Sequence, residues 1–139
     1  MMFKRILLAT DGSPVVEREV LFAAHLARLE HASIIVLHAY EPPPRYEGYE
    51  GYEQLLAQYR IVAQSVIDDT VNQLHKDGVD ARGELRQGPA ADVIIAAASE
   101  HDVHLIVMGT RGNSNLSDIL GSVSTQVLRH ARCPVLQIP

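Results

Sequence analysis

The chain has 139 residues, of which 47% are hydrophobic, and this length and composition predict one folded domain spanning residues 1–139. Twelve basic and seventeen acidic residues give a net charge of −5, which argues against sequence-independent binding to nucleic acid. No apolar segment approaches the roughly twenty residues that span a bilayer, and the apolar run at the N-terminus is too short for a signal peptide, so we expect a cytoplasmic protein without a membrane partner.

The first forty residues predict two strands separated by a helix. Residues 3–10 and 33–40 each contain a continuous apolar run, which is typical of a strand covered on both faces. Between them, Ser13 is a plausible N-cap and Pro14 suits the first helical position. Apolar residues then recur at helical spacing to about His31.

The middle of the chain begins with a segment rich in proline and tyrosine, residues 41–52, whose three prolines predict a surface loop without regular structure. A long amphipathic helix follows and ends near Gly78, which suits a helix C-terminus. Residues 79–88 are polar and alternate weakly, which predicts a strand at a sheet edge.

The last third predicts a short helix opening at Pro89, an apolar strand over residues 103–109, a helix over 122–131 and a final strand over 133–139. Strands and helices therefore alternate along the whole chain. This order predicts an α/β fold with a parallel sheet, right-handed crossovers and helices on both faces, a three-layer α/β/α domain.

A glycine-containing loop follows the strand that ends at Gly109. Two readings fit the further glycines at 112 and 121: an ordinary strand-to-helix connection, or a loop whose backbone N–H groups surround a phosphate. Ser122 stands where the last helix begins and Arg111 adds positive charge, which would both favour an anion. The loop is neither a Walker A sequence nor a dinucleotide fingerprint.

Asp11 directly follows the first strand and also allows two readings. Its carboxylate would shape the turn or cap the helix, or it would bind a ribose hydroxyl or help to hold a metal on phosphates. Ligands of open parallel sheets bind beyond the carboxyl ends of the strands, where both Asp11 and the glycine loop are expected.

The segments FKRILLATDGSP, IIVLHAY, GPAADVI, LIVMGTRG and GSVSTQVLRHARCPVLQIP together resemble the universal stress protein family, in the right order and over nearly the whole chain. The resemblance implies a five-stranded parallel sheet of order 3-2-1-4-5, which is Rossmann-like and similar to the adenine nucleotide alpha hydrolases. It also implies a homodimer paired through the last strand, residues 134–138. An apolar edge strand there would otherwise be exposed to water.

The resemblance further implies a site for ATP, or for ADP or AMP, in the branch of the family that binds nucleotides. Asp11 would contact the nucleoside, and Ala39 would offer its backbone to the adenine. Magnesium would bind through the phosphates, with Asp11 as a candidate ligand. The full set of implied nucleotide-binding residues is Ala9, Thr10, Asp11, Ala39, Met108, Gly109, Arg111, Gly112, Gly121, Ser122 and Val123.

One departure from the family pattern lies in the glycine loop. Eight residues separate Gly112 from Gly121, whereas the ATP-binding branch has nine. Asp118 also brings negative charge into this loop. A shorter connection would either leave the phosphate-binding N–H groups in place or turn Gly121 away from the site.

The seven histidines and the single cysteine predict neither a catalytic nor a metal site. The histidines are dispersed without ligand spacing, and His38 and His104 are expected to be core or strand-end residues. Cys133 is expected to be a small packed thiol, and a lone cysteine excludes an intramolecular disulfide. Tyr46, Tyr49 and Tyr52 would be a lid over adenine only if their loop folds back onto the site.

The sequence therefore favours a homodimeric regulator of the stress response that binds an adenine nucleotide and meets an unidentified partner protein. It carries no obvious general base for attack on a phosphate, so slow hydrolysis at most is expected and no enzyme. The alternative from another class is a protein-interaction module of the same fold without ATP. A third reading, an enzyme that processes adenylates, lacks a lysine or histidine in the glycine loop.

Overall fold

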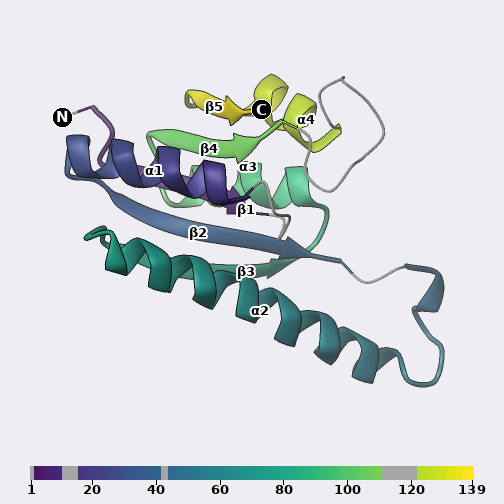
Figure 1. The fold of residues 1–139 in the computed structure, drawn as a ribbon. Coiled ribbons are helices and arrows are strands. Elements are labelled where there is room, and N and C mark those ends of the chain that lie inside the picture. The colour runs from purple at the N-terminus through teal and green to yellow at the C-terminus, as the bar shows by residue number, and fades with distance from the viewer. Residues whose placement is uncertain (1, 11–15, 42–43, 111–121) are drawn as a thin grey trace.

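The computed structural model describes residues 2–10, 16–41, 44–110 and 122–139. Over these residues the chain runs β1 (Arg5–Thr10), α1 (Val16–Glu30), β2 (Ser33–Tyr40), a 3₁₀ helix (Pro44–Tyr46), α2 (Tyr52–Lys76), β3 (Ala81–Gln87), α3 (Ala90–Glu100), β4 (Leu105–Gly109), α4 (Ser122–His130) and β5 (Val135–Ile138). Figure 1 shows this alternation of helices and strands. The predicted α/β fold is confirmed.

The five strands form one parallel sheet of order β3-β2-β1-β4-β5, as the resemblance implied. β1 lies at its centre, with Thr10 opposite His38 of β2 and Leu8 opposite Val107 of β4. β3 lies at one edge, which confirms the prediction made from its polar, weakly alternating sequence. The central strands are buried on both faces because helices cover both sides of a parallel sheet.

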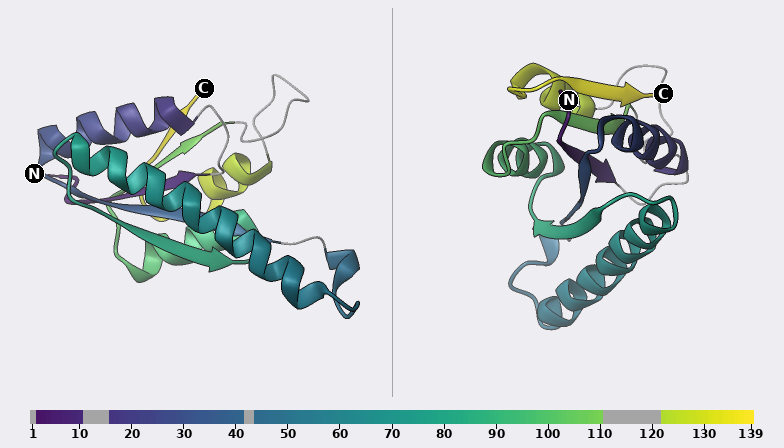
Figure 2. Two further views of the ribbon diagram at one scale, coloured as in Figure 1. Left: turned by 60° about the horizontal axis from the view of Figure 1, so that its bottom comes forward. Right: turned by 90° about the vertical axis from the view of Figure 1, so that its left-hand side faces the viewer.

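Two apolar clusters hold the helices to the sheet. One joins α1 and α2 to the face that carries Ile6 and Leu8, and the other joins α3 and α4 to the face that carries Leu7 and Ala9. Figure 2 shows the two helical layers on opposite sides of the sheet. Successive side chains of a strand point to opposite faces, so each buried strand contributes to both clusters.

The local endings of the elements follow the residues present. Gly78 takes φ +79° just beyond α2, and its N–H donates to the carbonyl oxygen of His75, so its predicted place at the helix C-terminus is confirmed. Pro89 precedes the first residue of α3, also as predicted. The predicted cap at Ser13 and Pro14 lies outside the described residues.

The expectation that the prolines exclude all regular structure from residues 41–52 is wrong at Pro44–Tyr46, which form a 3₁₀ helix. Proline is compatible with the first turn of a helix because its fixed φ is helical and the first N–H groups have no partner in the helix. No helix among the described residues is both long enough and apolar enough to span a membrane.

Candidate functional site

The carboxyl ends of β1, β2 and β4 meet at one edge of the sheet. β1 continues through a crossover to β2 on one side, while β4 pairs with it on the other, so the strand order reverses next to β1. Crevices form at such a reversal because the connections leave the sheet in opposite directions. Any ligand site of this fold is therefore expected near the last residues of these strands.

A cavity of about 500 Å³ lies at this edge, at the ends of β1 and β2 and between α2 and α3. A volume of this size is in the usual range for a small-molecule site. Its described lining residues are Ala9, Thr10, Leu37, His38, Ala39, Tyr40, Glu41, Gln58, Tyr59, Val62, Ala63, Ala90 and Ile94. Three residues predicted to bind nucleotide, Ala9, Thr10 and Ala39, are thus brought together.

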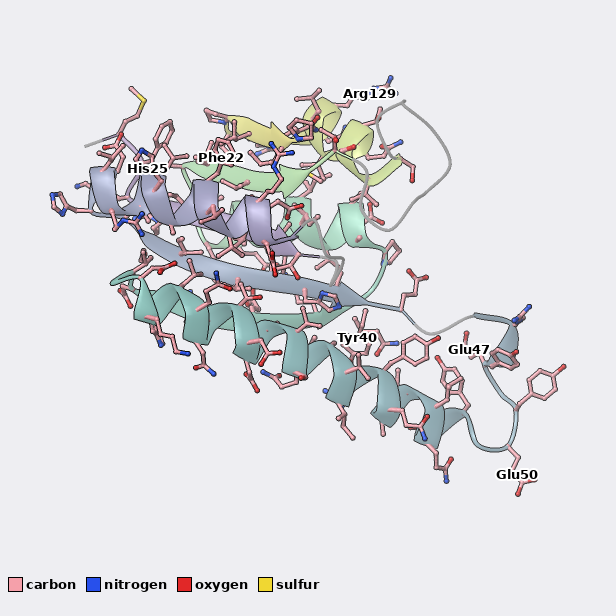
Figure 3. All side chains as sticks on the ribbon, in the orientation of Figure 1. Phe22, His25, Tyr40, Glu47, Glu50 and Arg129 are labelled. Atoms are coloured by element: carbon pink, nitrogen blue, oxygen red, sulfur yellow. The ribbon has the colours of Figure 1, made fainter. Side chains whose placement is uncertain are left out.

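The strand residues of the lining lie on both faces of the sheet. Leu37 and Ala39 pack with the cluster beneath α3, whereas His38 and Tyr40 alternate with them and lie on the side of α2. Figure 3 shows Tyr40 between the end of β2 and α2. The cavity therefore extends around the carboxyl end of β2.

The outer wall of the cavity is the first part of α2. None of the residues 52–62 is buried, whereas Ala63 and Ile67 pack under the rest of the helix. Figure 1 shows this part of α2 extending past the ends of β2 and β3. Tyr59 is half-buried and Val62 is exposed, and both line the cavity. An apolar wall that no strand covers is suited to contact a ligand.

Thr10 and His38 are polar lining residues that come from the strands. Thr10 is buried, and its Oγ1 has no hydrogen-bond partner within the described part of the chain. Nδ1 of His38 lies 2.9 Å from the backbone oxygen of Thr10. The sequence reading of His38 as a core or strand-end residue missed its place in the cavity. The amphipathic pattern that predicted the long helix before Gly78 likewise gave no sign that Tyr59 lines a cavity.

The other predicted residues of this edge lie apart from the described lining. Met108 is buried in the cluster beneath α3 and α4. A Cβ built at Gly109 would overlap the Oε1 atom of Glu19, a buried residue of α1. Gly109 therefore allows α1 to approach β4, and its predicted contact with a ribose stays a prediction.

The start of α4 holds the two last predicted positions that the structure describes. Ser122 is exposed, and Val123 packs partly against the apolar cluster. The hydroxyl of Ser124 donates to the carbonyl oxygen of Thr110 at 2.6 Å and so ties α4 to the end of β4. The remaining predicted binding residues lie outside the described residues: Asp11, Arg111, Gly112 and Gly121.

A separate ionic cluster joins the edge strand β3 to the end of α3. His101 and Arg86 contact Glu84 at 3.1 and 3.3 Å, and Arg86 also contacts Glu100 at 2.5 Å. Burial by itself raises the pKa of Glu84, but hydrogen bonds from His101 and Arg86 outweigh it and hold the pKa below its ordinary value. The hydrogen bond to Glu100 raises the pKa of Arg86.

Two expectations about reactive groups concern metals and the thiol. No group of three or more His, Cys, Asp and Glu side chains in the described ranges could hold a metal ion. Cys133 is half-buried against the cluster beneath α3 and α4, as expected for a packed thiol. Burial raises the pKa of this thiol, which lowers its reactivity.

An open parallel sheet of this order, with a cavity at its carboxyl edge, defines a Rossmann-like α/β protein. The chain belongs to the universal stress protein family, whose family model matches residues 2–139. The resemblance found in the sequence is thereby confirmed.

Comparisons with individual proteins agree with this assignment. The chain is 39% identical over 138 residues to the "universal stress protein in QAH/OAS sulfhydrylase 3′ region" of Thermus aquaticus, covering 99% of both chains. The solved structure of hypothetical protein MJ0577 matches with TM-score 0.90 and 26% identity, covering 99% of this chain and 96% of that one. The universal stress protein from Archaeoglobus fulgidus in complex with dAMP matches with TM-score 0.78 and 27% identity over the full length of both.

Proposed function

We propose that the chain binds an adenine nucleotide, with ATP as the expected ligand, and acts in the cytoplasm as a nucleotide-dependent regulator of the stress response. The observation that carries this proposal is the cavity at the carboxyl edge of β1 and β2, because it combines a largely apolar lining with a buried Thr10 hydroxyl that has no partner in the described chain. A relative of the same fold and family was solved in complex with dAMP, which supports an adenine ligand.

The base would enter the cavity beside Ala9, Ala39 and Ile94, where the lining is apolar. The phosphates would extend toward the start of α4, where Ser122 and Val123 offer the N–H groups of a helix N-terminus. Arg111, Gly112 and Gly121 complete this proposed phosphate site. Magnesium would bind through the phosphates, with Asp11 as a candidate ligand.

Isothermal titration of the purified protein with ATP, in the presence and absence of Mg²⁺, tests the proposal. Ala39→Leu adds side-chain volume at the cavity and should weaken ATP binding at least about tenfold, a change of about 1.4 kcal/mol. Ala57→Leu makes the same change at an exposed position of α2 outside the described lining and should leave the affinity unchanged. If millimolar ATP gave no heat of binding and no shift of the melting temperature, the result would favour the alternative, an interaction module of the same fold.

The proposed regulator does not turn over its ligand at a useful rate. Its effect would come from the nucleotide altering a surface that a partner protein recognises. Release of phosphate measured in single-turnover mixtures of protein, ATP and Mg²⁺ should stay close to the rate without protein. Rapid hydrolysis of ATP over many turnovers would contradict this proposal and indicate an enzyme.

The proposal includes a homodimer that pairs through β5. This strand is at the edge of the sheet, and its residues Val135, Leu136 and Gln137 are only half-buried in the single chain. An uncovered apolar edge strand tends to pair with another strand, which provides the physical motive. Analytical ultracentrifugation at micromolar concentration should give the mass of two chains, and a monomer would overturn this part of the proposal.

A further inference from the structure

The outer side of α1 carries large apolar side chains that stay in contact with water in the single chain. Leu21 and Leu29 are 61% and 62% exposed, and Phe22 is 45% exposed. A single exposed apolar residue is ordinary on a protein surface, but three within nine residues of one helix form a patch. Such a patch is typical of a site where another molecule binds.

These side chains belong to one continuous stripe along the helix, because residues three and four positions apart share a side of a helix. Steps of this kind connect six exposed residues, which we term the outer stripe: Arg18, Leu21, Phe22, His25, Arg28 and Leu29. At 1.5 Å per residue, the outer stripe is about 16 Å long. The buried residues of α1 lie on its opposite side, against the sheet. Figure 2 shows α1 in an outer layer of the molecule, with no described element over the side turned away from the sheet.

Two guanidinium groups give the outer stripe a positive charge near both ends. The side chains of Arg18 and Arg28 donate to the backbone carbonyl oxygens of Pro139 and Asp77 at 2.8 and 3.4 Å. Neither has an Asp or Glu side chain as an ion-pair partner in the described part of the chain, where the ion pairs lie on β3 and α3. Glu17 lies at the flank of the stripe, and the stripe itself contains no acidic residue. The chain has a net charge of −5, yet this surface favours a negatively charged partner.

The shape of the outer stripe favours a helix as the partner. The convex side of a helix encloses too little space to bury a small molecule. Rows of side chains at spacings of three and four instead form ridges that fit the grooves of a second helix. Phe22 and Leu29 are seven residues apart, the spacing at which the apolar anchors of an amphipathic helix recur. A partner helix of this kind would place its carboxylates near the two arginines.

We propose that the outer stripe of α1 binds an acidic amphipathic helix of a partner protein. The apolar face of that helix covers Leu21, Phe22 and Leu29, and its carboxylates pair with Arg18 and Arg28 at the two ends of the contact. The apolar contacts supply most of the affinity, and the charges select the sign and orientation of the partner. This inference rests on the part of the proposed function in which a partner protein recognises the regulator, and it adds the surface and the chemistry of that partner.

Two labelled synthetic peptides test the inference on the unaltered protein. The acidic peptide has about 16 residues, enough to span the outer stripe, with leucines at the spacing of one helix face and glutamates elsewhere. Fluorescence anisotropy should show micromolar binding that weakens several-fold at about 1 M salt. A second peptide with lysine in place of every glutamate should bind at least about tenfold more weakly. Absence of binding by the acidic peptide, or equal binding of the two peptides, would overturn the inference.

Variants of the outer stripe locate the binding on α1. Leu21→Gln and Leu29→Gln should each weaken binding of the acidic peptide about tenfold, because each removes an apolar contact from the patch. The double variant Arg18→Gln, Arg28→Gln should remove most of the salt dependence. Leu128→Gln is the matched control, since Leu128 is a leucine of α4 that is 54% exposed, and it should leave the affinity unchanged. Equal losses in Leu21→Gln and Leu128→Gln would overturn the inference.

A structural role or a different occupant of the stripe gives a different result. Leu21→Gln should leave the melting temperature unchanged, since the side chain is exposed, whereas a lowered melting temperature with unchanged peptide binding would overturn the inference. A smaller mass of Leu21→Gln in analytical ultracentrifugation would assign the stripe to a contact between copies of the chain. Tighter binding to phosphatidylglycerol vesicles than to the peptide, lost in Leu21→Gln, would assign it to a membrane surface. Either result would overturn the inference.

The peptide titration separates this inference from the proposed nucleotide function, because it is carried out without ATP. Binding of the acidic peptide by a protein that does not bind ATP would overturn the nucleotide proposal and support the stripe. Binding of ATP by a protein that does not bind the peptide would overturn the inference and leave the nucleotide proposal in place.

Discussion

Gly109→Ala tests whether this glycine is required for the packing of α1 on the sheet. A Cβ at position 109 would overlap Oε1 of Glu19 and lie 3.3 Å from its Cδ, while the carbonyl oxygen of Ile138 is 3.8 Å away. The carboxylate is the end of a long side chain, but Glu19 is only 3% exposed and has little space to move. We therefore expect the substitution to destabilise the fold.

The magnitude follows from two opposing effects. Overpacking a filled interior costs about 1–3 kcal/mol, and an overlap with a buried carboxylate belongs at the upper end of that range. Gly109 does not have a positive φ, so alanine fits the backbone, and the lower freedom of the unfolded chain returns about 0.4–1 kcal/mol. The net loss is about 2 kcal/mol, which lowers the melting temperature of a 139-residue chain by about 7 °C.

Thermal and urea unfolding of four proteins provide the measurement: the unaltered chain, Gly109→Ala, Glu19→Asp and the double variant. Aspartate is one methylene shorter and makes room for the new Cβ, so the two changes should couple favourably by about 1 kcal/mol or more. Unchanged stability of Gly109→Ala, or strictly additive effects in the double variant, would refute the reasoning. Titration of the double variant with ATP then measures the role of the glycine in binding without the packing defect.

Three further predictions concern the edge strand and the thiol. Gly83→Ala should lower the free energy of unfolding in urea by about 2–3 kcal/mol, because its Cβ would overlap Cγ2 of the buried, β-branched Ile67. Gly78→Ala should lower it by only about 1 kcal/mol, because alanine is strained at its φ of +79°. Equal losses in the two variants would contradict this prediction. Glu84→Gln should lower the free energy of unfolding by about 1 kcal/mol at pH 7. Because the pKa of Glu84 is lowered in the folded protein, this difference should disappear as the pH falls below 4.5, the ordinary pKa of a glutamate. A difference that persists at acid pH would count against the ionic contact. Cys133 should react with iodoacetamide more slowly than free cysteine at pH 8, because burial raises the pKa of its thiol. Unfolding in urea should remove this protection. Equal reaction rates in the folded protein and in urea would contradict the prediction.

The sequence predicted the elements of this fold well because their signals are local. The continuous apolar runs of β1, β2 and β4 are typical of strands covered on both faces, and these strands are buried. The weak polar alternation of β3 likewise predicted its place at the edge. The 3₁₀ helix at Pro44–Tyr46 was missed because proline prevents the continuation of a helix but is compatible with its first turn.

The candidate site was predictable only where strand ends are involved. Ala9, Thr10 and Ala39 end neighbouring parallel strands, so the alternation of elements was enough to bring them to one edge. Gln58 and Tyr59 reach the same cavity from a helix that begins after a long connection, and their spacing indicates only a helix face. Contacts of this kind depend on the direction in which a helix leaves the sheet.

The alternation of buried strands and amphipathic helices follows from local patterns of residues, and the strand order follows from the family resemblance. Only the folded chain shows that Thr10 and His38 line a cavity with residues of α2, and that Gly109 lies against Glu19. The difference arises because periodicity is a property of neighbouring residues, whereas side-chain contacts join residues that are distant in the chain. Periodicity records which side of an element is buried, whereas the groups that meet across that buried side are set by the packing of segments distant in the chain.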